Sequence, residues 1–317
     1  WLRGCIQESF FEKQQTRLGM TCAPIALFVY NRVWHTQQTV EALLNNFLAS
    51  RSDLIIFSDG AKRADDVEKV NKVREYIKQI DGFKSIAVFE NETNKGLANS
   101  IISGVSHVLD MNEQIIVLED DIVTSPYFLS YMNQGLHLYK NDHQVISIHG
   151  YVYPIKESLP KTFFLRGADC WGWATCKRGW QLFEKDGKHL LQQLTDQNLI
   201  NLFDFDASYP YSKMLSDQTK GLNDSWAVRW YASAFLKEKL TLYPNTSLVK
   251  NIGLDNSGTH SGSSNNFDGA LVDKEFVVER IALKDNTAAR KSFANYFRKG
   301  KRSFGTGLMQ RIAKLFS

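Results

Sequence analysis

Apolar and polar stretches alternate regularly over the first 120 residues. Short apolar runs predict β-strands at residues 23–30, 53–57, 85–89 and 114–118, of which the first and the last are expected to be buried in the sheet. Between them, residues 35–50, 64–80 and 98–108 carry apolar side chains at the spacing of amphipathic helices. Strands that alternate with helices over short connections are typical of a parallel sheet with right-handed crossovers. The pattern therefore predicts an α/β fold.

The second half of the chain is less regular. We expect strands at 145–149, 240–243 and 247–250, a helix at 226–237, and an aromatic, glycine-rich segment at 162–180. The polar, glycine-rich stretch 253–269 is long enough to be a functional lid. We expect a lead-in over 1–22, one main α/β domain over 23–283 and a basic amphipathic segment over 284–317.

Charge adds a distinct C-terminal segment to this picture. The formal net charge is +4, yet no acidic residue follows Asp285, while eight lysines and arginines do. Aromatic residues such as Phe293, Tyr296 and Phe297 are interspersed among these basic residues. A basic amphipathic segment with aromatics predicts contact with a membrane surface; the alternative is a disordered basic tail. No nucleic-acid recognition motif accompanies the tail, so we expect no nucleic-acid partner.

Cysteine usage and hydropathy bear on location. The four cysteines form no CxxC pair and no metal-ligand spacing, as expected of reduced thiols in a cytosolic protein. No apolar run is long enough to span a membrane, and no signal peptide is recognisable. We expect a cytoplasmic protein that contacts the inner face of the membrane peripherally. The chain begins at Trp1, so it is also compatible with a fragment of a longer protein.

The stretch QIIVLEDDIVTS, residues 114–125, is the centre of the sequence. An apolar strand runs directly into three carboxylates, Glu119, Asp120 and Asp121. In open α/β sheets, ligands bind at the carboxyl ends of the strands. Adjacent carboxylates repel one another, and a site for Mg²⁺ or Mn²⁺ would relieve that repulsion. The alternative is a solvated acidic turn that begins the helix near Pro126.

Polar residues also follow the other predicted strands. Arg32 follows the first strand, Asp59 the second and Lys95 the third. Arg32 and Lys95 can neutralise phosphate, and Asp59 can accept a hydrogen bond from a base or ribose. Each of these residues taken alone could equally be a surface charge or a turn residue. Together with the acidic cluster, they are the groups that would bind a nucleoside diphosphate and a divalent ion. The glycine-rich motifs of P-loop and dinucleotide-binding proteins are missing from the sequence, as are the GxSxG and HExxH motifs.

Strands ending in NR, SDG, NKG and EDD resemble those of the GT-A glycosyltransferases. The sequence is most similar to the N-acetylglucosaminyltransferase I-like branch and to bacterial family 2-type enzymes. The resemblance spans roughly residues 23–261 and implies a GT-A fold, a nucleotide-sugar donor and a DxD-type acidic motif, spelled EDD here. The sequence departs from the DxD spelling at the first position, where Glu119 stands in place of an aspartate.

The resemblance implies roles for the donor side of the site. Asp121 would ligate the metal that bridges the donor diphosphate, and His260, in the segment LDNSGTHS, would lie near the same metal. Glu119 and Asp120 would hold the ribose. Asp59 would meet the base, and Arg32 the donor.

The resemblance also implies roles on the acceptor side. Asp224, in the segment GLNDSW, is the candidate catalytic base; the alternative is an N-cap of the helix that follows. Trp171 and Trp173 would contact the acceptor; the alternative places both in the core.

These expectations converge on one activity. We expect a metal-dependent, inverting hexosyl- or N-acetylhexosaminyltransferase. It would move a sugar from a nucleotide-sugar, UDP-linked in the first instance, to a glycan or lipid-linked acceptor in surface polysaccharide assembly. The alternatives are a sugar nucleotidyltransferase, which usually begins with a glycine-rich loop that is lacking here, and a non-catalytic glycan- or membrane-binding module.

Overall fold

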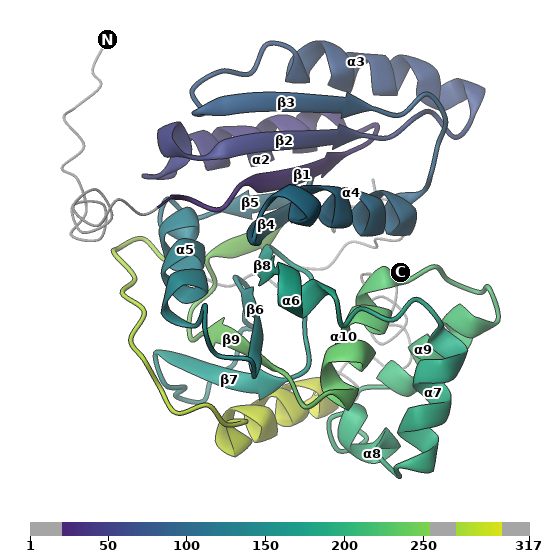
Figure 1. The fold of residues 1–317 in the computed structure, drawn as a ribbon, viewed down its shortest axis with the longest axis vertical. Helices are drawn as coiled ribbons and strands as arrows, with labels where there is room; N and C mark the ends of the chain where they lie inside the picture. The colour runs from purple at the N-terminus through teal and green to yellow at the C-terminus, as the bar shows by residue number, and fades with distance from the viewer. Residues whose placement is uncertain (1–20, 254–270, 300–317) are drawn as a thin grey trace.

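A computed structural model describes residues 21–253 and 271–299 of the chain. Within this part, eight strands form one mixed sheet in the order β3-β2-β1-β4-β8-β6-β9-β7, flanked by helices (Figure 1). The strands are β1 (Ile25–Val29), β2 (Asp53–Ser58), β3 (Ser85–Glu90), β4 (Gln114–Glu119), β6 (Val145–His149), β7 (Thr162–Arg166), β8 (Trp173–Cys176) and β9 (Leu240–Pro244). A second, two-stranded sheet pairs β5 (Ile122–Thr124) with β10 (Val249–Asn251).

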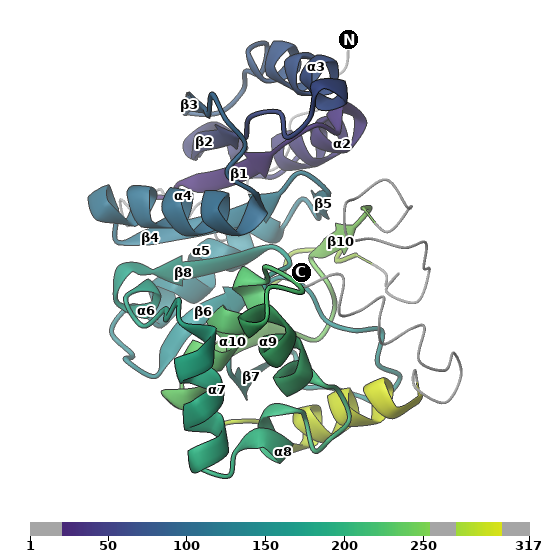
Figure 2. The same ribbon diagram turned by 90° about the vertical axis from the view of Figure 1, so that its right-hand side faces the viewer.

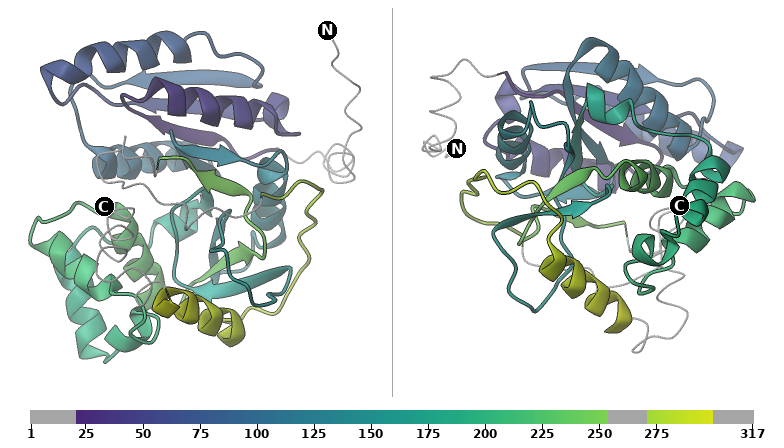
Figure 3. Two further views of the ribbon diagram at one scale, coloured as in Figure 1. Left: turned by 180° about the vertical axis from the view of Figure 1, so that it is seen from behind. Right: turned by 60° about the horizontal axis from the view of Figure 1, so that its bottom comes forward.

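The first half of the sheet is the parallel arrangement that the sequence predicts. Strands β3, β2, β1 and β4 run parallel to their neighbours. They are connected through α2 (Val33–Leu44), α3 (Val67–Ile77) and α4 (Leu97–Met111). Helices α2 and α4 cover opposite faces of the sheet (Figures 1 and 3). The apolar residues of β1 and β4 are therefore buried, as their unbroken apolar runs predict.

Helix α4 packs closely on the centre of this half. A Cβ on Gly104 would lie 2.6 Å from the Phe28 ring of β1, so only glycine fits there. The helix begins after Gly96, whose φ of +77° is readily adopted by glycine alone. These two glycines set how α4 approaches the sheet and how the preceding loop turns.

The second half of the sheet is mixed. Strand β8 is antiparallel to both β4 and β6, β9 is parallel to β6, and β7 is antiparallel to β9. Its helices are α5 (Phe128–Leu138), α6 (Lys177–Trp180), α7 (Gly187–Asp196), α8 (Ile200–Phe203), α9 (Tyr211–Thr219) and α10 (Trp226–Leu236). The strands expected at 145–149 and 240–243 and the helix at 226–237 are confirmed. Helices α7, α8 and α9 gather at the end of the molecule away from β3 and were not predicted (Figure 2).

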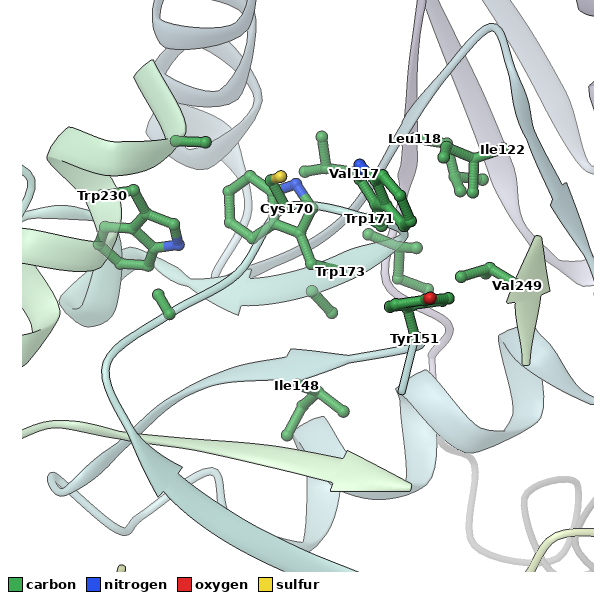
Figure 4. Packing of buried hydrophobic residues seen from close by; sticks show 14 of the residues in the cluster. Val117, Leu118, Ile122, Ile148, Tyr151, Cys170, Trp171, Trp173, Trp230 and Val249 are labelled. Carbon is green, nitrogen blue, oxygen red and sulfur yellow. The ribbon is translucent and has the colours of Figure 1, made fainter. Parts of the chain in front are cut away.

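A cluster of tryptophans forms the core between β8 and the helices. Trp173 is 1% exposed, and its ring packs on those of Trp180, Trp226 and Trp230 at centroid distances of 5.5–6.0 Å. Figure 4 shows Trp173 and Trp230 of this cluster. Large aromatic rings packed together in this way contribute strongly to the hydrophobic core. Trp173 was expected to contact an acceptor, but its burial favours the alternative, in which it belongs to the core.

The last described residues, up to 299, pack on the domain. A helix at 287–299 lies along β7 and buries Phe293 and Phe297, which are 2% and 1% exposed (Figure 1). The Phe293 ring contacts Phe163 of β7 and Tyr243 of β9. Two aromatics that the sequence analysis assigned to a membrane-contacting segment are therefore core residues. Residues 300–317 of that segment lie outside the described part.

No helix of the described residues is both long and apolar enough to cross a membrane. Among the described residues, Cys170 and Cys176 are free thiols. Burial raises the pKa of Cys170 well above its usual value, with the charge of Asp169 as the next cause.

Candidate active site

Sheet register places the predicted site residues at one edge. Phe28 of β1 pairs with Glu119 of β4, and Val29 pairs with Ser58 of β2. Residues that leave these strands at their carboxyl ends therefore emerge side by side. Arg32 follows β1, Asp59 follows β2, and Asp120 and Asp121 follow β4.

The turn that carries Asp120 and Asp121 is held by its backbone. The Thr39 hydroxyl of α2 donates to the carbonyl of Asp120 at 2.9 Å. The N–H of Ile252 donates to the carbonyl of Asp121 at 2.9 Å, where β10 pairs with β5. The turn is thus fixed from two sides, and its carboxylates are positioned before any ligand binds.

Arg32 joins the two carboxylates of this turn. Its Nη2 donates to Asp120 Oδ1 and, at 2.8 Å, to Asp121 Oδ2. The three side chains are 18%, 7% and 13% exposed. Burial pulls the pKa of Arg32 down, but the two carboxylates outweigh burial and raise that pKa. The guanidinium therefore remains charged and neutralises part of the acidic turn.

Burial and the repulsion between neighbouring carboxylates raise the pKa values of the acidic residues, against the effect of Arg32. Burial, then the charges of Asp121 and Asp120, raise the pKa of Glu119 to about 8, with Arg32 acting in the opposite direction. Burial also raises the pKa of Asp120, against the attraction of Arg32. An additional positive group at this turn would relieve both effects.

The residues of the turn fit a divalent cation. Asp120 Oδ2 is buried and has no hydrogen-bond partner, although a buried carboxylate oxygen normally has one. Mg²⁺ and Mn²⁺ are bound through one or two carboxylates, together with water and substrate phosphates. Asp120 and Asp121 could supply these ligands. Among residues 21–253 and 271–299, no three His, Cys, Asp or Glu side chains converge as a metal site, and His260 lies outside these ranges.

Gly253 closes over the carboxylates and was missed by the sequence analysis. A Cβ built on it would lie 2.1 Å from Asp121 Oδ2 and 2.9 Å from Arg32 Nη1. Only a residue without a side chain fits against this ion pair. No local pattern reveals this requirement, because it arises from a contact between segments far apart in the sequence.

Asp59 organises the loop that carries Lys95. Its carboxylate accepts hydrogen bonds from the backbone N–H groups of Gly60, Lys95 and Gly96 at 2.9–3.1 Å. The side-chain amides of Asn91 and Asn94 also donate to it, at 3.3 and 3.0 Å. Both of its oxygens are therefore engaged within the protein. Asp59 fixes the loop, and the Lys95 side chain is exposed at the rim.

Asp224 stands on a different element from the acidic turn. It precedes α10 and is 64% exposed on its side chain, with Oδ1 3.2 Å from Arg229 Nη2. The N-cap of α10 is Ser225, whose hydroxyl accepts from the Val228 N–H at 3.1 Å. Ser225, and not Asp224, therefore caps the helix. The Asp224 carboxylate faces solvent beside Arg229.

The aromatic residues near the site divide into buried and exposed ones. Trp171 is 6% exposed and packs edge-on against Tyr151 near Val117, Leu118 and Ile122 (Figure 4). Like Trp173, it presents no open ring to an acceptor. Trp34 is 54% exposed and lies in the first turn of α2, two residues after Arg32. The sequence analysis overlooked it, although it lies only four residues after the end of the strand predicted at 23–30.

Comparison with known families gives one match. The model of the family described as "Glycosyl transferase family 2" matches residues 25–198, which include β1 to β4 and the acidic turn. No curated protein matches the chain.

The chain is also similar to solved structures at low identity. One is the mannosyltransferase PcManGT from Pyrobaculum calidifontis in complex with GDP-Man and Mn²⁺. It is 11% identical, the match covers 71% of this chain and 80% of that chain, and the TM-score is 0.33. Another is S. aureus TarS, which is 11% identical; the match covers 70% of this chain and 36% of that chain, with a TM-score of 0.35. A third is a UDP-glucose pyrophosphorylase complexed with UDP-glucose. It is 12% identical, the match covers 53% of this chain and 82% of that chain, and the TM-score is 0.31.

Proposed function

Because the family match covers more than half of its length, this chain belongs to glycosyl transferase family 2, and we propose that it is a metal-dependent, inverting enzyme with a UDP-linked donor. Its acceptor in this proposal is a glycan or lipid-linked saccharide of surface polysaccharide assembly. The transferred group is a hexosyl or N-acetylhexosaminyl unit.

The observation that carries the proposal is the convergence of charges at one sheet edge. Asp120 and Asp121 leave β4 beside Arg32, which leaves the neighbouring strand β1. A divalent ion that accompanies a nucleoside diphosphate is held by one or two carboxylates together with the phosphates, and a nearby cation can offset the remaining negative charge. The orphaned, buried Asp120 Oδ2 supports this assignment, because it lacks a partner that a bound ligand would supply.

Each donor-side residue has a proposed task. Arg32 and Lys95 would neutralise the diphosphate, while Glu119 and Asp120 would accept hydrogen bonds from the ribose. Asp59 would shape the base pocket indirectly, because its carboxylate already holds the loop 91–96. Trp34, exposed beside Arg32, would offer a stacking surface to a base or sugar.

Asp120 and Asp121 would hold the divalent ion. When bound, Mn²⁺ or Mg²⁺ offsets negative charge that develops on the departing diphosphate. The Thr39 hydroxyl and the Ile252 N–H donate to the backbone carbonyls of the turn and keep it in place. His260 is proposed as a further ligand on the strength of the sequence resemblance alone.

The proposed transfer is a single displacement. The acceptor oxygen forms a bond to the anomeric carbon as the bond from that carbon to the diphosphate oxygen breaks. Asp224 takes the proton of the acceptor hydroxyl, acting as general base. This geometry inverts the anomeric configuration and needs no covalent nucleophile.

A donor-turnover assay tests this proposal. We would incubate the protein with a panel of UDP-, GDP- and dTDP-sugars, with and without Mn²⁺, and follow nucleoside diphosphate release by NMR. We expect release from one UDP-sugar, dependent on Mn²⁺ and lost in Asp121→Asn, with inversion at the anomeric carbon of the product. Release without added metal, or with retention of configuration, would contradict the proposal.

A further inference from the structure

The contact between Arg32 and the acidic turn has a consequence for metal binding. The guanidinium donates to one oxygen of each carboxylate, Asp120 Oδ1 and Asp121 Oδ2. The same two side chains are the ones that fit a divalent ion. Asp120 Oδ2 is left without a partner, but an ion bound there would still share both carboxylates with the guanidinium. Two cations at one pair of carboxylates repel each other in a poorly hydrated setting, where charges interact more strongly than in water.

The surroundings leave little room for both cations. Gly253 lies so close that an added Cβ would overlap Asp121 Oδ2 at 2.1 Å and approach Arg32 Nη1 at 2.9 Å. The turn itself is fixed by Thr39 on one side and Ile252 on the other. These contacts hold the backbone of the turn in place, and the Arg32 side chain has more rotatable bonds than either aspartate with which to leave the pair.

We propose that Arg32 acts as an internal counter-cation that must leave the Asp120–Asp121 pair before a divalent ion is held there. The inference rests on the proposed function, because a nucleoside diphosphate would give the displaced guanidinium a new anionic partner. Planar, bidentate hydrogen bonding suits arginine to phosphate as well as to carboxylate. Metal and nucleotide would then bind with positive cooperativity, each tightening the other by the same factor.

Lysine at this position would not be equivalent. A lysine ammonium is a point charge without the fork of the guanidinium, so it would bridge two carboxylates less well. A neutral glutamine would leave the acidic pair without a counter-cation. The two substitutions therefore separate the effect of charge from that of geometry.

Calorimetric titration with Mn²⁺ alone, and again with saturating UDP or GDP, tests this inference without an activity readout. In the wild type we expect weak Mn²⁺ binding that a nucleotide tightens by roughly 5- to 150-fold, the usual range for coupling between two ligands. In Arg32→Gln, Mn²⁺ alone should bind tighter by a comparable factor, and the nucleotide effect should shrink. Arg32→Lys should fall between the two.

A matched control removes the same charge elsewhere. Arg280 is 54% exposed and pairs with Asp142 at 2.8 Å. Asp142 precedes β6, which runs in the same direction as β4 because both are antiparallel to β8, so this pair lies at the amino ends of the strands. Arg280→Gln should leave both Mn²⁺ affinities as in the wild type. Thermal unfolding of each variant verifies that it is folded.

Two results would overturn the inference. One is Mn²⁺ binding to Arg32→Gln that is no tighter than to the wild type in the absence of nucleotide. The other is a nucleotide that binds the wild type but leaves its Mn²⁺ affinity unchanged. If neither nucleotide binds the wild type, the proposed UDP donor fails, while the comparison of Mn²⁺ alone still decides the role of Arg32.

Discussion

Asp59 illustrates how a single carboxylate can position a site without facing the ligand. It accepts hydrogen bonds from three backbone N–H groups and two side-chain amides, which belong to Gly60 and the loop 91–96. The sequence analysis placed Asp59 correctly at a strand end but assigned it a direct contact with the base. The hydrogen bonds that redirect this assignment come mainly from backbone N–H groups, which no residue pattern reveals.

Substitution of Asp59 by asparagine tests this positioning role. The amide cannot accept on both sides, and its NH₂ group would face backbone N–H donors. We expect the free energy of unfolding to fall by about 2–3 kcal/mol, the scale of lost hydrogen bonds to a charged group. Urea denaturation measures the change, with the exposed Asp81→Asn as control. Equal stability of the two variants would contradict the role.

Asp224 carries the proposed base function and can be tested separately from binding. Asp224→Asn should lower the rate of sugar transfer by roughly 10²- to 10⁴-fold, the usual contribution of a general base. Nucleotide affinity should be unchanged, because in this proposal Asp224 acts on the acceptor hydroxyl and holds no part of the nucleotide.

Glu238 provides a control for Asp224. It is also an exposed carboxylate beside a largely buried arginine, with 3.3 Å between Glu238 Oε1 and Arg166 Nη1. Glu238→Gln should retain wild-type turnover. Near wild-type turnover in Asp224→Asn would refute the assignment of the base.

His149 gives the fold a pH dependence. Its side chain is 1% exposed, and Nε2 accepts the Trp171 N–H at 3.1 Å. Burial lowers the pKa of His149 below 6.5, although Asp169, 3.7 Å from Nδ1, acts in the opposite direction. The rings of Tyr151 and Tyr243 also contact the imidazole. The native state therefore holds the imidazole neutral where the unfolded chain would protonate it.

Stability should fall as the pH drops below about 6.5, because the unfolded state then binds a proton that the native state does not. The contribution of His149 to this slope is at most about 1.4 kcal/mol per pH unit. Urea denaturation from pH 7.5 to 5.0 should show a shallower slope for His149→Gln, whose amide oxygen can still accept from Trp171. Parallel slopes in the two proteins would exclude His149 as the source.

At the scale of elements, the helix at 287–299 is part of the domain. Phe293→Ala should lower the free energy of unfolding by about 3–5 kcal/mol, since it leaves a cavity among the rings of Phe163, Phe205 and Tyr243. Lys299→Ala, at a side chain that is 69% exposed, should change stability by no more than about 0.5 kcal/mol. If both variants matched the wild type, the helix would not contribute to the core.

Elements were predictable where their local pattern was long and regular. The four parallel strands and three crossover helices of the first half were placed from apolar periodicity alone. Strand β8 was missed because its four residues are too short to show a period. Helix α7 could have been found, because Asp186 caps it by accepting from the Lys188 and His189 N–H groups, and leucines follow at helical spacing.

At the scale of the whole molecule, the order of the strands in the sheet brings residues that are distant in sequence together at one site. Because β1 lies between β2 and β4, residues after three separate strands share one edge, as the sequence predicts for a parallel sheet. The approach of Gly253 and the burial of Trp171 and Trp173 depend on how the second half folds back. Those contacts join distant segments, so they could not be predicted from local patterns.

Nucleotide binding at the acidic turn is the central claim, and a thermal-shift screen tests it most directly. UDP, GDP, CMP and dTDP would each be added, with and without Mn²⁺, to the wild type and to Asp121→Ala. A ligand that binds the native state raises the melting temperature by mass action. We predict a rise with UDP that requires Mn²⁺ and disappears in Asp121→Ala. A melting temperature unchanged by every nucleotide, or a rise that persists in Asp121→Ala, would contradict the account.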